Sequence, residues 1–291
     1  MLTDVAGIEI GHWTDPVALT GCTVIVLPEG TVASGEVRGG APATREFALL
    51  EPTRTVATVD AVVLSGGSAF GLAAGDGVMG WLAERDRGFV TSAGRVPIVV
   101  GLSLFDLAVG DGSVRPGTAE GRLAAESARA ESPALGPVGA GTGCTVAKWF
   151  HPDAPPPGGL GGATLRAGDV VVSALIAVNA VGAIDDGTSI ADPGPPPAPP
   201  TPDGEEGEPT GDDRGNTTIG VVATNAVIDK VGCRLVAESA HDGLARSLLP
   251  AHTAFDGDAV VACATGEVEA DLRHVRVLAQ QAVAAAVRSL G

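Results

Sequence analysis

The chain has 291 residues, is 45% hydrophobic and carries a formal net charge of −17. This length and a mean hydropathy of +0.27 allow one large or two ordinary domains with a sizeable core. The acidic balance argues against partners such as nucleic acid or an anionic membrane surface. No apolar run approaches the roughly 18 residues of a spanning helix. The first residues lack a basic stretch followed by an apolar one, so we expect no signal peptide and a cytoplasmic location.

The core must be built from small and aliphatic residues. Only nine residues are Phe or Trp, Tyr is absent, and there are 42 glycines. This composition suits Val, Ala, Leu and Ile packed closely against backbone. The four cysteines have no metal-ligand spacing, and we expect buried reduced thiols and neither a metal nor a cofactor.

The first half of the chain alternates apolar runs with helical patterns. We predict strands at residues 23–27, 57–64 and 96–104, and helices at residues 69–83 and 118–131. Ser68 follows Ser65-Gly66-Gly67 at a strand–helix junction. The esterase pattern Gly-x-Ser-x-Gly is absent, so we interpret Ser68 as the helix N-cap.

The second half contains the strongest strand pattern, at residues 169–181, whose valines predict burial on both faces. Further strands are expected at residues 217–225 and 259–264, and helices at residues 231–249 and 271–290. Residues 191–213 hold eight prolines and seven acidic residues, which predicts a mobile linker inside one domain. The order of elements predicts a mixed α/β protein with two sheets between helices.

Thr217 stands at the first position of a strand, directly after the acidic linker. If the Asn216–Thr217 bond were cut, Thr217 would carry a free α-amine beside its hydroxyl. Such an amine can act as the general base for the hydroxyl. A turn followed by an ordinary strand is the commoner meaning of Asn-Thr-Thr.

Five other polar residues admit two interpretations each. The amide of Asn179, inside the strongest strand, is either bound to nearby backbone or directed into a site. Lys148 is more typical of a surface lysine with a packed stem. His241 is more typical of a helix surface than of a site. Asp256 and Asp258 are more typical of a turn than of a cation site.

Taken together, these motifs resemble the P1 family of peptidases, also called peptidase family S58. The resemblance runs along most of the chain and rests on the order and number of its motifs. They are Val37–Pro42, Leu64–Leu72, Gly141–Lys148, Val178–Gly182, Asn216–Asn225, His241–Arg246 and Phe255–Asp258. With a threonine at residue 217, the chain is most similar to the branch of the endo-type 6-aminohexanoate-oligomer hydrolase. The aminopeptidase branch has serine there.

The resemblance implies a four-layer αββα sandwich similar to that of N-terminal-nucleophile hydrolases. It implies self-cleavage into a large chain, 1–216, and a small chain, 217–291, which then assemble as tetramers or larger homo-oligomers. Substrates would be small amides, short peptides, β-peptides or oligoamides.

The resemblance also implies a role for each site residue. Thr217 would be the nucleophile, and Asn179 would help to bind the oxyanion. Lys148 would add positive charge, while Asp256 and Asp258 would orient the amine and the hydroxyl.

One departure is Phe105, where relatives often have a tyrosine that assists the site; rate and substrate class could differ as a result. Two other functions compete with hydrolysis. One is acyl transfer of the ornithine acetyltransferase type, although Asn-Thr-Thr-Ile-Gly-Val lacks the nucleophile context of that family. The other is an uncleaved structural role without catalysis.

Overall fold

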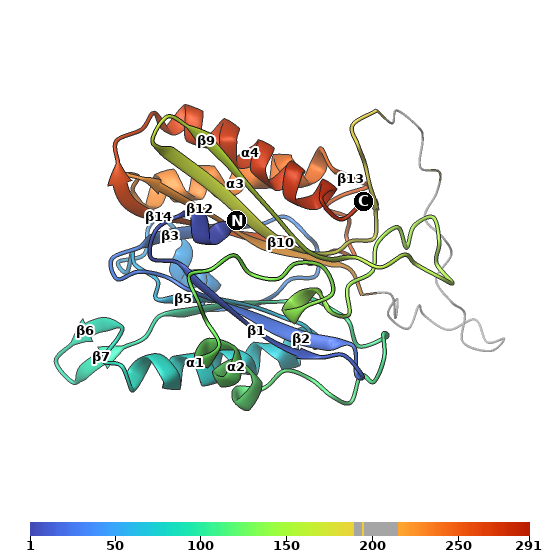
Figure 1. The fold of residues 1–291 in the computed structure, drawn as a ribbon, viewed down its shortest axis with the longest axis horizontal. Coiled ribbons are helices and arrows are strands. Elements are labelled where there is room, and N and C mark those ends of the chain that lie inside the picture. Colours follow the sequence, from blue (N-terminus) through green and yellow to red (C-terminus); the bar gives the residue numbers. More distant parts are fainter. Residues whose placement is uncertain (189–193, 195–214) are drawn as a thin grey trace.

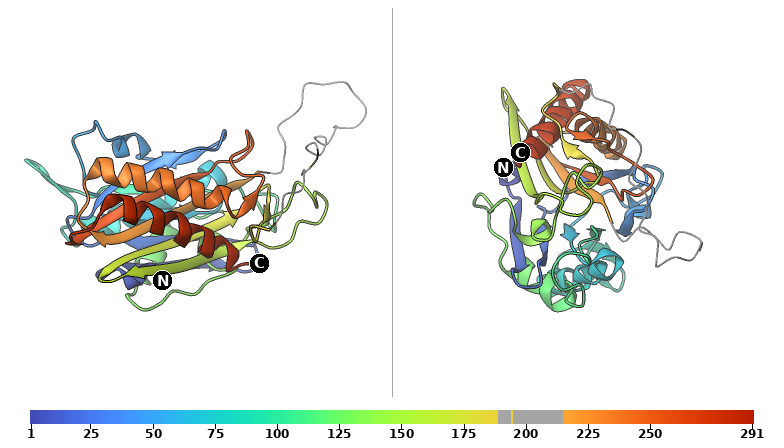
Figure 2. Two further views of the ribbon diagram at one scale, coloured as in Figure 1. Left: turned by 90° about the horizontal axis from the view of Figure 1, so that it is seen from above. Right: turned by 90° about the vertical axis from the view of Figure 1, so that its right-hand side faces the viewer.

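The computed structural model describes residues 1–188, 194 and 215–291. Two five-stranded sheets pack face to face, and a pair of helices covers the outer face of each (Figures 1 and 2). This arrangement is the expected αββα sandwich. Apart from Gly194, the predicted linker at residues 191–213 lies outside the described residues.

The first sheet is formed by residues from the first third of the chain. Its order is β1 (Glu9–Asp15), β2 (Thr20–Val26), β5 (Ala61–Ser65), β8 (Val99–Ser103) and β4 (Ala43–Arg45). Strands β5 and β8 are parallel, and the other neighbours are antiparallel. Helices α1 (Ala74–Ala83) and α2 (Thr118–Glu126) cover its outer face, where Val63 and Trp81 share one apolar cluster.

The second sheet carries the rest of the architecture. Its order is β3 (Val32–Val37), β14 (Ala259–Val268), β12 (Thr217–Ala226), β10 (Val170–Asn179) and β9 (Gly159–Ala167). Strands β12 and β14 are parallel; the other pairs are antiparallel. Helices α3 (Lys230–Ala245) and α4 (Leu272–Arg288) cover its outer face (Figure 1).

Short elements complete the described chain. They are the hairpin β6 (Phe89–Thr91) and β7 (Gly94–Val96), the pair β11 (Ala183–Ile184) and β13 (Leu248–Leu249), and the 3-10 helices η1 (Leu2–Asp4), η2 (Phe47–Leu50), η3 (Ser68–Ala73) and η4 (Gly139–Gly141).

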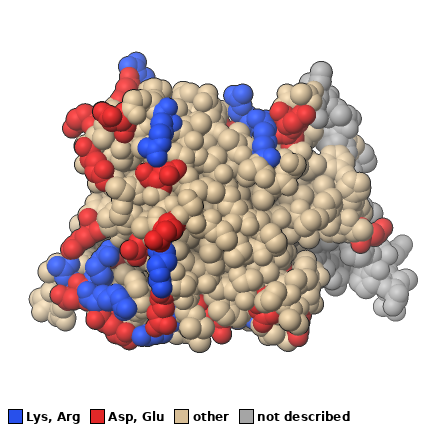
Figure 3. All heavy atoms as spheres, viewed as in Figure 1, with Lys and Arg blue, Asp and Glu red and all other residues tan. Residues whose placement is uncertain are grey.

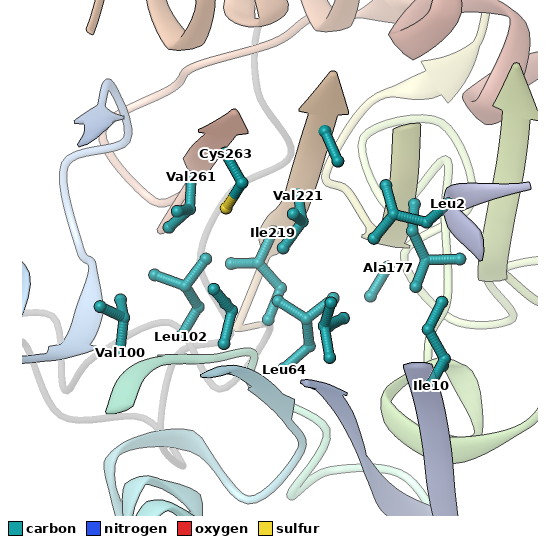
Figure 4. Close-up of a cluster of buried hydrophobic side chains, with 14 of the residues drawn as sticks. Leu2, Ile10, Leu64, Val100, Leu102, Ala177, Ile219, Val221, Val261 and Cys263 are labelled. Atoms are coloured by element: carbon teal, nitrogen blue, oxygen red, sulfur yellow. The ribbon is translucent and has the colours of Figure 1, made fainter. Parts of the chain in front are cut away.

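The main core fills the space between the two sheets. Leu64 and Leu102 of the first sheet face the second sheet, where Ile219 and Val221 project toward them (Figure 4). Every residue of β12 is buried, because sheet covers one of its faces and helices cover the other. This double burial explains its apolar sequence. All four cysteines are buried free thiols, as predicted.

The structure corrects several expected boundaries. The predicted helix at residues 69–83 divides into η3 and α1, and the helix predicted at 231–249 ends at Ala245. Ser68 is not an N-cap: it lies inside η3 with a left-handed φ of 54°, and η3 has no side-chain cap.

Charged side chains are unevenly distributed over the face shown in Figure 3. Acidic and basic groups lie near one another along the left of this face and in a smaller group at its upper right, and its middle is mostly uncharged. Within the described ranges, no helix combines the length and the apolar character needed to cross a membrane.

Candidate active site

The topology of the second sheet brings four of the predicted site residues together at one end of its central strands. The parallel strands β12 and β14 both start at this end, so Thr217 lies beside the loop that carries Asp256 and Asp258. Antiparallel β10 ends there, and its last residue, Asn179, pairs with Thr217. All four side chains are buried, which favours directed polar contacts over contacts with water.

The Thr217 hydroxyl lies against the peptide bond that precedes it. It donates a short hydrogen bond to the carbonyl oxygen of Asn216. The Gly257 N–H donates to the same oxygen at 3.0 Å. A Cβ at residue 257 would lie 2.9 Å from the Thr217 Oγ1, so glycine permits this close approach. The Asn216 carbonyl is therefore held between a hydroxyl and a backbone donor.

The Asn216 side chain adds an unfavourable term to this arrangement. Asn216 is 3% exposed, and neither its Oδ1 nor its Nδ2 has a hydrogen-bond partner within the described part of the chain. Burying an unpaired amide costs about 1–3 kcal/mol.

Lys148 is buried beside the same segment, so the expectation of a surface lysine is wrong. Its Nζ donates to Asn179 Oδ1 at 2.8 Å, to Asn179 O at 3.0 Å and to Gly215 O at 3.3 Å. Burial lowers the pKa of Lys148 to about 8. The Lys148 ammonium group thus contacts the carbonyl of Gly215, the residue before Asn216, and it titrates close to neutral pH.

Asn179 makes both of the contacts that the sequence left open. Its Oδ1 accepts from Lys148 and from the Thr145 N–H, the latter at 3.0 Å. Its Nδ2 donates to Phe105 O at 2.7 Å and to Gly215 O at 3.4 Å. The donors to Asn216 O are the Thr217 hydroxyl and the Gly257 N–H, and Asn179 donates to Phe105 O and Gly215 O instead.

The two carboxylates are held by different donors. Asp258 Oδ1 accepts from the Thr218 N–H at 2.7 Å, and its Oδ2 is 2.8 Å from His252 Nδ1. Asp256 Oδ2 accepts from the N–H and hydroxyl of Thr253 at 2.9 and 2.6 Å. Burial, followed by the charge of Asp258, raises the pKa of Asp256 to about 6.

Sequence reasoning missed three contributors to this site: Gly257, Gly215 and His252. The quoted motif Phe-Asp-Gly-Asp contains Gly257 between the two carboxylates, but only the register of Asn216 beside Asp256 shows what its N–H contacts. His241, expected on a helix surface, is fully buried and lies behind the site with its ring against His252.

Two cavities flank the segment before Thr217. The larger, of about 320 Å³, is lined by Thr217, Asn216, Ser103 and Phe255 among others. The smaller, of about 210 Å³, contains Lys148 and Asp153. Phe105 and Gly215 line both, so the chain at Gly215 separates them. Among the residues that the structure describes, no group of three or more His, Cys, Asp or Glu gathers to hold a metal.

Solved structures share this sandwich. A Burkholderia sp. beta-aminopeptidase superposes with a TM-score of 0.71 over 98% of this chain and 84% of its own, at 21% identity. The L-aminopeptidase D-Ala-esterase/amidase of Ochrobactrum anthropi, described as a variant of the Ntn-hydrolase fold, gives a TM-score of 0.71 over the same shares at 18% identity. The fold is therefore that of the Ntn-type hydrolases.

Sequence comparison gives the family. The profile of peptidase family S58 matches residues 1–290. A protein of Mycobacterium leprae named as an uncharacterized aminopeptidase is 44% identical over 92% of this chain and 79% of its own. A 6-aminohexanoate-oligomer endohydrolase of Agromyces sp. is 31% identical over 91% of this chain and 75% of its own. The chain belongs to peptidase family S58, as the motifs indicated, and is a hydrolase of the peptidase class.

Proposed function

We propose that this protein is a self-processing amidohydrolase that acts through an acyl-enzyme on Thr217. One observation carries the proposal. The Thr217 hydroxyl contacts the carbonyl of its own preceding peptide bond, while the Gly257 N–H donates to the same oxygen. A nucleophile on one side and a fixed donor where negative charge would develop are two of the requirements of acyl transfer.

Self-cleavage would begin with attack of Thr217 Oγ on the Asn216 carbonyl carbon. The C–N bond breaks, the hydroxyl proton passes to the departing nitrogen, and an ester joins Asn216 to Thr217 Oγ. Water then hydrolyses the ester, which yields a carboxylate at Asn216 and a free α-amine and hydroxyl at Thr217. Cleavage would free the Asn216 side-chain amide, which is buried without a hydrogen-bond partner in the described chain, and this release favours the cleaved state.

In turnover, the new α-amine would accept the hydroxyl proton as Oγ attacks the substrate carbonyl. An α-amine with a pKa near 7.7–8.0 suits this role at neutral pH. The Lys148 ammonium would disfavour protonation of the nearby amine and stabilise the developing oxyanion. Asn179 holds Lys148 in place, and its Nδ2 would become available as an oxyanion donor once Gly215 withdraws.

The substrate's acyl group would occupy the place of Gly215 and Asn216, between the two cavities. The names of the relatives support amides of amino acids, β-peptides or aminohexanoate oligomers as substrates. Turnover can be compared on an amino-acid p-nitroanilide, a β-dipeptide and a 6-aminohexanoate oligomer, each with a free and an acetylated amine. A correctly processed protein that hydrolyses none of them would contradict the proposal.

Self-processing is tested directly by Thr217→Ala and Thr217→Ser. We expect Thr217→Ala to remain a single inactive chain, and Thr217→Ser to retain cleavage because it keeps a hydroxyl. Thr218→Val is a matched control, since the Thr218 hydroxyl is buried and has no partner in the described chain. Denaturing gels, intact mass and N-terminal sequencing report the cleavage point. A small fragment that begins anywhere except Thr217 would refute the mechanism.

A further inference from the structure

We propose that His252 is a positioning residue: as an imidazolium, it holds Asp258, which aligns the backbone beside the nucleophile. The proposal rests on the function proposed above for Thr217. His252 is not the nucleophile, and it is not among the residues to which the family resemblance assigned a role. It reaches the site only through Asp258.

The contacts of His252 require two ring donors. Its Nδ1 lies 2.8 Å from Asp258 Oδ2, and its Nε2 lies 3.2 Å from the carbonyl oxygen of His241. Both neighbours are acceptors when Asp258 is ionised, and a neutral imidazole carries only one N–H. The imidazolium form alone satisfies both contacts.

Asp258 passes this contact on to the nucleophile strand. Its Oδ2 also accepts from the His252 N–H at 3.2 Å, and its other oxygen accepts from the Thr218 N–H at 2.7 Å. Its side chain is only 2% exposed. The carboxylate of Asp258, held in place by His252, accepts a charge-assisted hydrogen bond from the amide that follows Thr217.

His252 has an unusual backbone conformation, and packing holds its ring in place. It adopts a left-handed φ of 56°, which is uncommon for a residue with a Cβ. Its ring makes an edge contact with that of His241, with ring centroids 4.9 Å apart. His241 is fully buried, and its Nε2 lies 2.9 Å from the carbonyl oxygen of Glu36, so it is held as a neutral donor. These contacts tie helix α3 to the loop before β14.

Several charged groups act on His252. Asp258 favours its protonation and Arg38 opposes it, while burial also opposes it. Asp242 offsets part of the Arg38 charge through a contact of 3.3 Å. Burial is the largest single effect and lowers the pKa of His252, but the hydrogen bond and charge of Asp258 and the hydrogen bond to His241 O together leave that pKa above its ordinary value. Burial lowers the pKa of the adjacent His241 to about 4, so it adds no competing charge at neutral pH.

The first experiment measures the charge of His252 without using activity. Exchange of the histidine C2 hydrogen with deuterium, followed by peptide mass spectrometry over pH 5–9, gives a pKa for each histidine. We expect the pKa of His252 to lie above about 6.5 in the wild-type protein and below it in Asp258→Asn. A wild-type value at or below the ordinary one would overturn the proposal, whether or not the protein hydrolyses amides.

The second experiment is a double-mutant cycle on self-cleavage and turnover. We expect His252→Gln to slow both by about tenfold to a hundredfold, as for loss of a charge-assisted hydrogen bond. The double variant His252→Gln/Asp258→Asn should be no slower than Asp258→Asn, because His252 acts through Asp258. His274→Gln, at an exposed histidine of α4, is the control and should match wild type.

Thermal unfolding of each variant separates positioning from loss of the fold. Additive effects in the cycle, or a His252→Gln protein with wild-type rates, would refute the positioning role. If the wild-type protein neither cleaves itself nor turns over substrate, the proposed function fails, and the exchange experiment still decides the charge of His252.

Discussion

Asp256 and Asp258 are two residues apart, yet their surroundings give them different tasks. Asp258 has a histidine and backbone donors around it, whereas Asp256 is bonded to Thr253 and faces the charge of Asp258. The loop thus provides one carboxylate with a matched partner and one whose pKa is raised to about 6.

This difference predicts a gain of stability on removing the charge of Asp256. The folded-state pKa lies above the unfolded value near 3.9, so ionisation costs the folded state free energy as pH rises from about 4 through about 6. We expect Asp256→Asn to raise the free energy of unfolding at pH 7 by about 2 kcal/mol, with little gain at pH 4. Urea unfolding at both pH values measures it.

The same variant should process itself and turn over substrate about a hundredfold more slowly, because an orienting group is lost. Glu269→Gln removes one exposed charge just after the far end of β14 and serves as the control. Equal stability changes at pH 4 and pH 7 would show that the charge of Asp256 is not the cause.

At the scale of elements, the spacing between the start of β12 and the loop before β14 decides where the proposed nucleophile, Thr217, lies. Gly257 fills this space with backbone alone: a Cβ there would lie 2.7 Å from Ala41 O and 2.9 Å from Thr217 Oγ1. We expect Gly257→Ala to displace the Thr217 hydroxyl and slow self-cleavage at least tenfold, by about 1.4 kcal/mol or more in the barrier.

A second glycine provides the matched control. A Cβ at Gly80 in α1 would meet nothing within 4 Å, so Gly80→Ala should leave cleavage unchanged and stabilise the fold by about 0.5–1 kcal/mol. Time courses of cleavage after refolding compare the two. Rapid cleavage in Gly257→Ala would mean that this close approach does not control the nucleophile.

Elements buried on both faces could be predicted from the sequence, and edge elements could not. The apolar runs of β10 and β12 have sheet and helix on opposite faces, and their predicted bounds were within two residues of those observed. Strands β1, β3 and β9 were missed because each lies at a sheet edge and carries polar or glycine residues. Edge strands need no continuous apolar run.

The same limit applies to the site. The sequence predicted that Thr217 starts a strand and that Asp256 and Asp258 lie in the loop before another, as observed. Only the family resemblance assigned these residues to a site. Burial of Lys148 and His241 depends on packing between distant segments, so local sequence favoured a surface position for both and was wrong. The contact of His252 with Asp258 depends on a left-handed backbone at His252, and the residue types in this loop do not predict that conformation.

At the scale of the whole molecule, the proposed cut would leave the second sheet built from both fragments, with the two strands of the small fragment in its interior. Strands β14 and β12 lie between β3 and β10, which belong to the other side of the cut. Helices α3 and α4 bury apolar faces on the same sheet. We expect the two fragments to remain together on gel filtration and to separate only in denaturant. Native mass spectrometry showing free small fragment would contradict this.

The residues from 217 onward form β12, α3, the short strand β13, β14 and α4, and they include Thr217, Asp256 and Asp258. Lys148, Asn179 and Phe105 come from the remainder. Neither piece holds a whole site, so two separate genes could encode the enzyme. Maturation would then be an encounter between two polypeptides, and its rate would follow the product of their concentrations.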